Sequence, residues 1–341
     1  MNVYGDYPVE NAVDIVLLPD GYTAQEMEKF KKDCQFFVQS LFSYAPYNRY
    51  TDRFNVRAVL VPSLDSDVTM PGDKLYRNTA LSCSFWTFDS ERYCMTYDNE
   101  TMKTLAGQVP YDQIYILANT KKYGGGGIFN SYCVSTTGDS YASDVIIHEF
   151  GHGFAGLADE YAYDGTDNYC LEVEPWEPNI TTLVDFESKW ADLVAPETPI
   201  PTPNTNQYNN TVGAFEGGGY LTEGMYRPQR HCMMRDYAPF CAVCNRTIEA
   251  VIEAHSDTPV AVKSEQLLPE SSLRVCPNPA TEFIDVFVNQ EVGQAEIIDM
   301  NGKTAMSVQL KNEVNRITIS DLPNGMYLLR ANGETRKFVK Q

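Results

Sequence analysis

The chain has 341 residues, 43% of them hydrophobic, and carries a formal net charge of −20 at pH 7. Because a single domain usually holds about 100–200 residues, this length predicts two domains, the first with a substantial hydrophobic core. The acidic surface argues against nucleic acid and anionic membranes as partners, and no apolar run of about 20 residues predicts a transmembrane segment.

The first part of the chain predicts an α/β fold. Residues 12–18 form the continuous apolar run typical of a buried strand, residues 24–41 place apolar side chains at helical spacing, and residues 54–61 return as a strand. Residues 113–117 predict a further strand, so this order indicates a β-α-β unit. Residues 1–12 lack the basic and apolar regions of a signal peptide, and we expect a mature or truncated chain.

Four consecutive glycines lie within residues 123–130. This stretch has two interpretations. As an edge strand it would line a substrate cleft and pair with an extended polypeptide. As a flexible surface loop it would have no such role, and four glycines do weaken a strand.

The most informative motif is HEFGH at residues 148–152. Residues four apart lie on one face of an α-helix, so His148 and His152 can bind one metal ion. Glu149 is offset by one position, where its carboxylate can act as general base on a water for metal-assisted hydrolysis. The alternative is a helix with two surface histidines, but the apolar residues 145–147 favour a buried helix. The motif therefore predicts the zinc site of a metallopeptidase.

Two acidic residues compete for the third ligand position. In metzincin-type zinc peptidases a glycine ends the helix and a ligand follows three residues later, since glycine tolerates a left-handed turn. Here that glycine is Gly156, which favours Asp159. Gly156 lies four residues after His152 instead of the usual three, so the helix should run one residue longer. This departure keeps Glu160 open as the alternative ligand, because both carboxylates suit zinc.

Met233 and Met234 are candidates for the methionine turn that lies beneath the metal in metzincins. The alternative is ordinary core packing by flexible side chains. Tyr237 and Arg235 are close to this turn in sequence and could donate a hydrogen bond to the developing oxyanion, with Tyr161 as a third choice. Each of the three could equally be structural.

These motifs together resemble the signature of the IgA peptidase family of metallopeptidases, a metzincin-like group. The resemblance covers roughly residues 10–255 and implies a zinc endopeptidase that acts on a polypeptide or glycoprotein. It does not imply immunoglobulin as the substrate, because pockets vary within a family. The matching segments are residues 148–161, which are the most specific, together with residues 13–23, 30–33, 218–220, 226–228 and 240–244.

Two further metal sites are considered. Residues 164–168 (DGTDN) offer oxygen ligands that suit structural calcium, although the complete loop signature of a calcium hand is missing. Cys241 and Cys244, with Cys232 and His231 nearby, have the residue types of a second, structural zinc site. A compact disulfide or buried thiols would explain the same cysteines.

Residues 256–273 predict a linker, and an all-β sandwich is expected after it. Residues 272–341 carry eight basic and eight acidic residues, so the whole net charge of −20 lies on residues 1–271. Residues 283–288 and 317–320 alternate as strands do. Three pairs predict hairpin-type turns, namely Asn301-Gly302, Asn324-Gly325 and Asn332-Gly333.

This C-terminal part resembles the sorting domain of type IX secretion. The matching segments are residues 276–280 (CPNPA), 298–303, 322–328 and the basic end at 337–340, with Cys276 where the family usually has tyrosine. The resemblance implies the type IX secretion machinery as a partner and a secreted or cell-surface location. A carbohydrate-binding or spacer sandwich is the alternative.

Export also bears on the nine cysteines. In an oxidising compartment most of them should pair, and the odd number leaves at least one free. Cys34, on the apolar face of its predicted helix, is our choice for the free thiol. Cys83 and Cys94 are close enough in sequence to form a local bridge.

We therefore expect a zincin- or metzincin-like catalytic domain at residues 1–255, a linker at 256–273 and a β-sandwich sorting domain at 274–341. The favoured function is a secreted zinc endopeptidase whose acidic cleft selects extended polypeptide. The second hypothesis is a surface binding protein with a zinc site and no turnover. The intact Glu149 argues against the second, because a degenerate site loses its need for a base.

Overall fold

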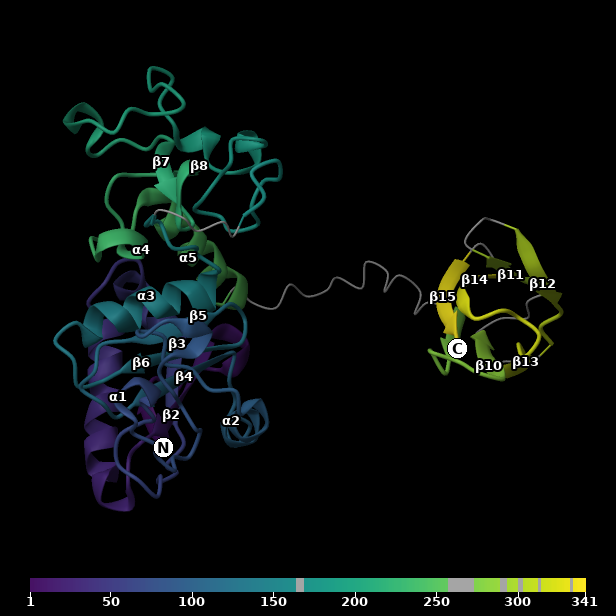
Figure 1. The fold of residues 1–341 in the computed structure, drawn as a ribbon, viewed down its shortest axis with the longest axis horizontal. Coiled ribbons are helices and arrows are strands. Elements are labelled where there is room, and N and C mark those ends of the chain that lie inside the picture. Colours follow the sequence, from purple (N-terminus) through teal and green to yellow (C-terminus); the bar gives the residue numbers. More distant parts are fainter. Residues whose placement is uncertain (164–168, 257–272, 289–292, 300–302, 312–313, 332–333) are drawn as a thin grey trace. The chain divides into compact units, whose positions relative to one another are not determined.

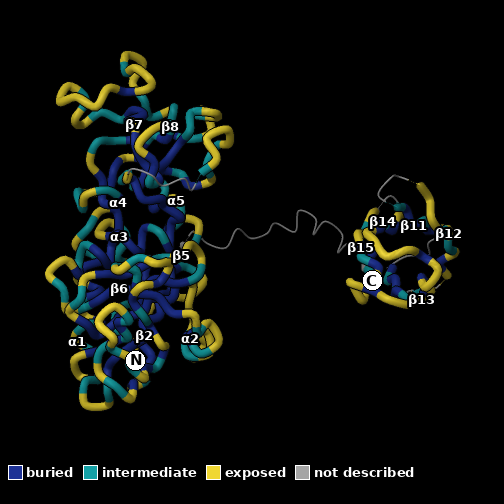
Figure 2. The backbone as a smooth tube through the Cα atoms, viewed as in Figure 1, coloured by how far each residue is buried: buried dark blue, intermediate teal, exposed yellow. Residues whose placement is uncertain are grey.

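The structure is a computed structural model that describes all residues except 164–168, 257–272, 289–292, 300–302, 312–313 and 332–333. The chain divides into two compact units, Met1–Pro259 and Val260–Gln341 (Figure 1). Each unit has its own buried core (Figure 2). The candidate calcium loop, residues 257–272 of the expected linker, and the Asn301-Gly302 and Asn332-Gly333 turns lie outside the described residues.

A six-stranded sheet forms the centre of the N-terminal unit, in the order β1-β3-β2-β4-β6-β5. Its four inner strands are parallel, whereas the edge strands β1 and β5 run antiparallel to their neighbours. Parallel strands are the expected product of the β-α-β unit in the sequence. The strands are β1 (Asn2–Tyr4), β2 (Val13–Asp20), β3 (Phe54–Ala58), β4 (Gln113–Ala118), β5 (Gly125–Ile128) and β6 (Tyr132–Thr136).

Both faces of this sheet are covered, which explains the continuous apolar run in β2. Alternate residues of a strand point to opposite faces, so Ile15 packs in one core and Val16 in the other. Helices α1 (Met27–Leu41), α3 (Ala142–Ala155) and α5 (Ala242–Ser256) contribute to the first core, and α2 (Asn99–Ala106) contributes to the second.

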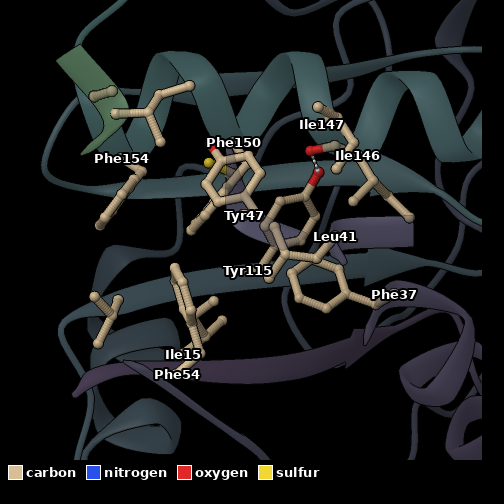
Figure 3. Packing of buried hydrophobic residues seen from close by; sticks show 14 of the residues in the cluster. Ile15, Phe37, Leu41, Tyr47, Phe54, Tyr115, Ile146, Ile147, Phe150 and Phe154 are labelled. Carbon is tan, nitrogen blue, oxygen red and sulfur yellow. Dashed lines mark hydrogen bonds between the residues drawn. The ribbon is translucent and has the colours of Figure 1, made fainter. Parts of the chain in front are cut away.

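The first core fixes α3, which carries the HEFGH motif, against the sheet. Phe37 of α1 and Phe150 of α3 pack around Tyr115 of β4 (Figure 3). The Tyr115 hydroxyl donates a 3.2 Å hydrogen bond to the carbonyl oxygen of Ile146 in α3. This bond satisfies a buried polar group and sets the position of the helix along the strand.

A hairpin and a short helix complete the N-terminal unit. The hairpin is β7 (Phe215–Gly218) with β8 (Leu221–Arg227), and the helix is α4 (Met233–Asp236). Among the described residues, the structure contains no helix with the length and apolarity needed to span a bilayer. Short 3-10 helices lie at Val9–Asn11, Ala24–Glu26, Tyr47–Arg49, Thr51–Arg53, Pro71–Asp73, Thr87–Asp89, Phe186–Ser188, Ala191–Leu193 and Asn206–Tyr208.

The C-terminal unit contains two antiparallel sheets, in the orders β13-β10-β9 and β12-β11-β14-β15. Val286 of the first sheet and Ile297, Leu329 and Phe338 of the second share one buried cluster, as expected for a sandwich. The predicted hairpin turn at Asn324-Gly325 is wrong, because the pair stands at the start of β14, and β14 and the preceding strand β13 belong to different sheets. The strands are β9 (Leu273–Cys276), β10 (Phe283–Val288), β11 (Ala295–Asp299), β12 (Thr304–Val308), β13 (Val314–Thr318), β14 (Gly325–Ala331) and β15 (Glu334–Lys340).

Candidate metal centre

Helix α3 ends where the glycine spacing predicts. Gly156 adopts the left-handed conformation with φ of 63°, and its N–H donates to the carbonyl of His152. This backbone angle is one that residues with a Cβ rarely adopt, so it favours glycine here. The helix thus runs one residue longer than in the usual motif, and the chain then turns back across its end.

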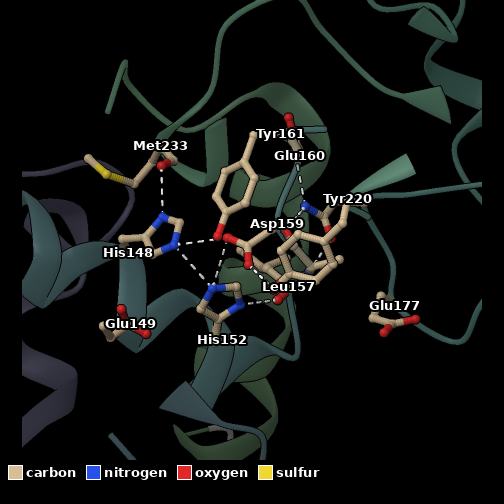
Figure 4. Close-up of polar contacts among 12 residues, drawn as sticks. His148, Glu149, His152, Leu157, Asp159, Glu160, Tyr161, Glu177, Tyr220 and Met233 are labelled. Carbon is tan, nitrogen blue, oxygen red and sulfur yellow. Dashed lines mark hydrogen bonds and ion pairs between the residues drawn. The ribbon is translucent and has the colours of Figure 1, made fainter. Parts of the chain in front are cut away.

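The turn at Gly156 brings Asp159 to the two histidines of α3 (Figure 4). Nε2 of His148 lies 3.0 Å from Oδ1 of Asp159, and Nε2 of His152 lies 3.3 Å from the same oxygen. The two Nε2 atoms are 3.1 Å apart. Three side chains from positions 148, 152 and 159 therefore converge on one point, and they could hold a metal ion there.

Backbone carbonyls fix how both imidazole rings face this point. Nδ1 of His148 lies 3.1 Å from the carbonyl oxygen of Met233, and Nδ1 of His152 lies 2.6 Å from that of Leu157. A carbonyl oxygen can only accept, so each Nδ1 carries the proton and donates. Each Nε2 then presents a lone pair toward the centre, which is the tautomer of a metal-binding histidine.

The Asp159 carboxylate is buried, and its two oxygens differ in their hydrogen bonding. Its Oδ2 accepts a short hydrogen bond from the Tyr220 hydroxyl. Its Oδ1 has no hydrogen-bond partner among the described residues, although it faces both histidines. A buried carboxylate oxygen is costly unless a donor or a cation faces it, and either a proton on a histidine Nε2 or a metal ion at the centre would satisfy Oδ1. The three residues thus fit a metal ion.

The charge of Asp159 also favours a cation at this centre. Burial lowers the pKa of His152, but the nearby Asp159 carboxylate outweighs burial and raises this pKa to about 9. In the protein without metal, a proton on His152 therefore balances Asp159 near neutral pH. A divalent ion that binds here must displace that proton.

Glu149 lies beside the three convergent side chains and lines a pocket of about 330 Å³ together with them. Burial raises the pKa of Glu149 above its ordinary value, while His148 and His152 act in the opposite direction. Its position, one residue from His148, is the one that the sequence predicts for a general base.

The glycine-rich stretch forms β5, the edge strand against which α3 packs. A Cβ at Gly127 would lie 2.5 Å from the carbonyl oxygen of Glu149 and 2.9 Å from Cβ of His152. A Cβ at Gly125 would lie 2.6 Å from the carbonyl oxygen of Val134. Gly127 is therefore needed because α3 approaches the strand closely, and Gly125 because β6 does. The stretch is an edge strand and not a loop, whereas its pairing with substrate stays a prediction.

Both predicted methionines are buried next to α3. Met233 supplies the carbonyl that accepts from His148, and the Met234 carbonyl accepts a 2.7 Å hydrogen bond from the N–H of Glu160. A Cβ at Gly151 would lie 2.9 Å from Sδ of Met234. The pair thus connects the helix, the segment after it and α4.

Three residues were considered as donors to an oxyanion, and all three line the pocket. The Tyr237 ring meets the His148 ring edge-on at 5.8 Å, and its hydroxyl makes a short hydrogen bond with that of Tyr123. Arg235 instead donates to the carbonyl of Arg230 and to Asp236. The Tyr161 hydroxyl accepts a hydrogen bond from Arg92.

Sequence reasoning missed Arg92. Its guanidinium donates to the hydroxyls of Tyr161 and Tyr163 at 2.9 and 2.8 Å, and it lies over the ring of Tyr93. All four residues line the pocket. Tyr93, Tyr161 and Tyr163 form an aromatic wall of the pocket. The chain contains 22 tyrosines, but this composition does not indicate which of them line a pocket.

Tyr220 lies in the segment 218–220 that resembles the family, but the sequence alone indicates no role for it. It contacts Asp159 through the hydrogen bond to Oδ2. The N–H of Gly219 donates a 2.8 Å hydrogen bond to the Asp159 carbonyl oxygen, so the β7–β8 hairpin holds both ends of this residue. The chain order gives no sign of this pairing, because the two segments are 61 residues apart.

Glu160, the alternative ligand, points away from the histidines (Figure 4). It belongs to a second group of buried side chains with Cys232, Cys241 and Cys244. His231 does not join this group, because it is exposed and its Nδ1 is 2.6 Å from Asp236. The expectation that His231 accompanies the cysteines is therefore wrong.

The expected disulfides are absent, since all nine cysteines are free thiols in the structure. Cys34 is buried and free, as predicted. Cys83 and Cys94 are also unpaired, so the predicted local bridge is wrong. Both are buried in the second core, where a thiol packs as a small apolar group.

Comparison with known families agrees with these observations. The family model described as IgA Peptidase M64 matches residues 5–210 and 204–252. The model described as secretion system C-terminal sorting domain matches residues 274–341, which confirms the second resemblance. No curated protein matches the chain. The sorting domain marks the protein for type IX export to the cell surface or the medium. The chain therefore belongs to the IgA Peptidase M64 family of peptidases and ends in a type IX sorting domain.

Proposed function

We propose that this protein is a secreted zinc-dependent endopeptidase in which His148, His152 and Asp159 hold the zinc. The observation that carries the proposal is the convergence of two Nε2 atoms and one carboxylate oxygen within 3.3 Å of one another. Zinc bonds of ~2.0–2.2 Å in tetrahedral geometry place ligand atoms ~3.3–3.5 Å apart, close to these separations. Three protein ligands beside an open pocket are typical of catalytic zinc.

The chemistry follows from the groups around the centre. When bound, zinc acts as a Lewis acid that polarises a peptide carbonyl and makes water more acidic. Glu149 accepts the proton of the attacking water and later donates it to the leaving amine. Burial raises the pKa of Glu149, which suits both steps because a more basic carboxylate accepts and holds the proton better.

Tyr237 is the proposed donor to the oxyanion. Burial raises the pKa of its phenol, so the hydroxyl stays protonated and can donate. Arg235 is the weaker candidate, because its guanidinium already donates to Arg230 and Asp236. Tyr161 stays the third candidate, because its hydroxyl accepts from Arg92 and its own O–H is still free to donate.

The substrate is proposed to be an extended polypeptide that binds along β5. Residues 92–94 already occupy part of this edge, because Gly125 exchanges hydrogen bonds with Arg92 and Cys94. Alternate residues of an antiparallel strand direct their N–H and C=O groups to the same edge, so those of Gly127 face the same side. Gly127 lines the pocket, and its backbone groups are therefore placed to pair with substrate.

The test is cleavage of a proteome-derived peptide library by zinc-loaded protein, with new termini mapped by mass spectrometry. Glu149→Gln is compared with Glu100→Gln, a change of the same kind on the exposed surface of α2. We expect cuts with the wild type and with Glu100→Gln, and none with Glu149→Gln. Equal cleavage by Glu149→Gln would refute the general-base role. Zinc binding without cuts in any sample would favour a surface binding protein without turnover.

A further inference from the structure

A second group of potential metal ligands lies next to the proposed catalytic centre. It consists of Glu160, Cys232, Cys241 and Cys244, whose ligand atoms all lie within 4.8 Å of one another. All four residues are buried, and three of them, Glu160, Cys232 and Cys244, have no exposed surface at all. Nothing in the peptidase mechanism uses these side chains.

Glu160 is the observation that points to an ion. Its Oε1 accepts a 2.9 Å hydrogen bond from Asn179, but Oε2 is buried without a hydrogen-bond partner among the described residues. No ion pair reaches Glu160 within the part of the chain that the structure describes. A charged carboxylate here needs a cation, and a protonated one needs an acceptor for its O–H, so the protein side chains alone leave it unsatisfied.

The separations between ligand atoms match tetrahedral zinc. Zn–S bonds of ~2.3 Å and Zn–O bonds of ~2.0–2.2 Å put sulfur atoms ~3.8 Å apart and sulfur and oxygen ~3.6 Å apart. Sγ of Cys232 lies 3.7 Å from Sγ of Cys244. Oε1 of Glu160 lies 3.8 Å from Sγ of Cys241 and 3.3 Å from Sγ of Cys244.

The backbone around the cysteines is arranged for thiolates. The N–H of Cys241 donates to Sγ of Cys232 at 3.3 Å, and the N–H of Cys244 donates to Sγ of Cys241 at 3.4 Å. Donors of this kind stabilise sulfur that carries negative charge. Cys241-x-x-Cys244 also has the close ligand spacing of structural zinc sites, here at the start of α5.

We propose that Glu160, Cys232, Cys241 and Cys244 bind a structural zinc ion that is separate from the catalytic one. Three thiolates favour a soft, closed site, and with four protein ligands no position is left for water or substrate. The site joins two segments of the catalytic centre to α5. Glu160 follows Asp159, Cys232 precedes Met233, and α5 packs with α3 in the first core. The ion therefore fixes the third catalytic ligand and the carbonyl that orients His148.

The first experiment counts zinc in the full chain by plasma mass spectrometry. We expect two zinc ions per chain in the wild type and one in the His148→Ala/His152→Ala double variant. Cys241→Ser/Cys244→Ser should lose the second ion, whereas Cys170→Ser, at an exposed cysteine, should keep both. One ion in the wild type and none in the histidine variant would overturn the proposal.

A spectroscopic measurement keeps the test decisive if the cysteine variant fails to fold. Cobalt(II) replaces zinc in the His148→Ala/His152→Ala protein, where only the second site remains. A strong near-ultraviolet sulfur-to-cobalt charge-transfer band is expected, together with alkylation of these thiols only after the metal is removed. No such band, or a mass two hydrogens lower that shows a disulfide among Cys232, Cys241 and Cys244, would contradict it. Because these readouts need no catalysis, they stand or fall separately from the peptidase proposal.

Discussion

The carbonyl oxygen of Met233 lies 3.1 Å from Nδ1 of His148, a residue 85 positions earlier in the chain. This contact uses the backbone of Met233, so its geometry depends on how α4 is held and not on the side chain itself. The two methionine side chains are both fully buried and hold α4 against α3. Positioning of a metal ligand is thus coupled to ordinary core packing.

Met234→Ala should lower the free energy of unfolding by about 2–5 kcal/mol, because it removes a buried side chain next to Gly151 and leaves a cavity. It should also weaken metal binding, since α4 and its carbonyl can then shift. Urea denaturation measures the first effect, and competition with a chromophoric chelator measures the second. Met234→Leu keeps the volume and should cost less than about 1.5 kcal/mol. Equal losses from both changes would contradict this role.

Tyr220→Phe should weaken zinc binding about 10–100-fold, because it removes the hydroxyl that donates to Oδ2 of Asp159. Tyr226→Phe, in β8 of the same hairpin, is the matched control and should bind zinc as the wild type does. Chelator competition at one fixed pH compares the three proteins. Unchanged affinity in Tyr220→Phe would show that Asp159 needs no support from the hairpin.

Zinc affinity should rise with pH up to about 9. The folded-state pKa of His152 is raised to about 9 by Asp159, so below this pH the ring is protonated and zinc must displace a proton. Below pH 9 the apparent affinity should therefore increase about tenfold per pH unit, and it should level off above it. Calorimetry in buffers of different ionisation enthalpy should show about one proton released per zinc near pH 7. A pH-independent affinity between pH 7 and 9 is the result that this account does not allow.

Tyr237→Phe should lower kcat about 10–100-fold with little change in KM, since a donor to the oxyanion acts mainly in the transition state. Arg235→Gln should have a smaller effect, because Arg235 is already bonded to Arg230 and Asp236. Steady-state kinetics on one peptide identified from the library gives both values. A larger loss of kcat from Arg235→Gln would reverse the assignment.

Local rules were sufficient for much of the site. Helical spacing relates His148 to His152, and the left-handed preference of glycine predicts both the end of α3 at Gly156 and the approach of Asp159. Strands β2, β3 and β4 could be predicted from their apolar residues, because buried parallel strands are rich in them, whereas β1 and β6 were not predicted. The helix, its glycine end and strands β2, β3 and β4 depend on residues that are close together in the sequence, so a sequence pattern can reveal them.

The remaining features depend on residues far apart in the chain. Tyr220 reaches Asp159 only through the pairing of the hairpin with residues 159–163, and Arg92 reaches the pocket only because its segment bonds to Gly125 of β5. The side chains of the neighbouring residues Asp159 and Glu160 point to different metal-ligand groups. The glycine spacing alone could not decide which of the two carboxylates faces the histidines. The disulfide expectation was wrong because it rested on the compartment, whereas a disulfide also needs two cysteine side chains in bonding geometry, which only the tertiary fold decides.

The central claim is that Glu149 activates water at a zinc ion held by His148, His152 and Asp159. The most direct test measures zinc content and peptide hydrolysis in the same preparations of wild type and Glu149→Gln. The account predicts equal catalytic-site zinc in both, with kcat/KM lowered at least about 100-fold in Glu149→Gln. Hydrolysis at the wild-type rate by zinc-loaded Glu149→Gln would contradict it.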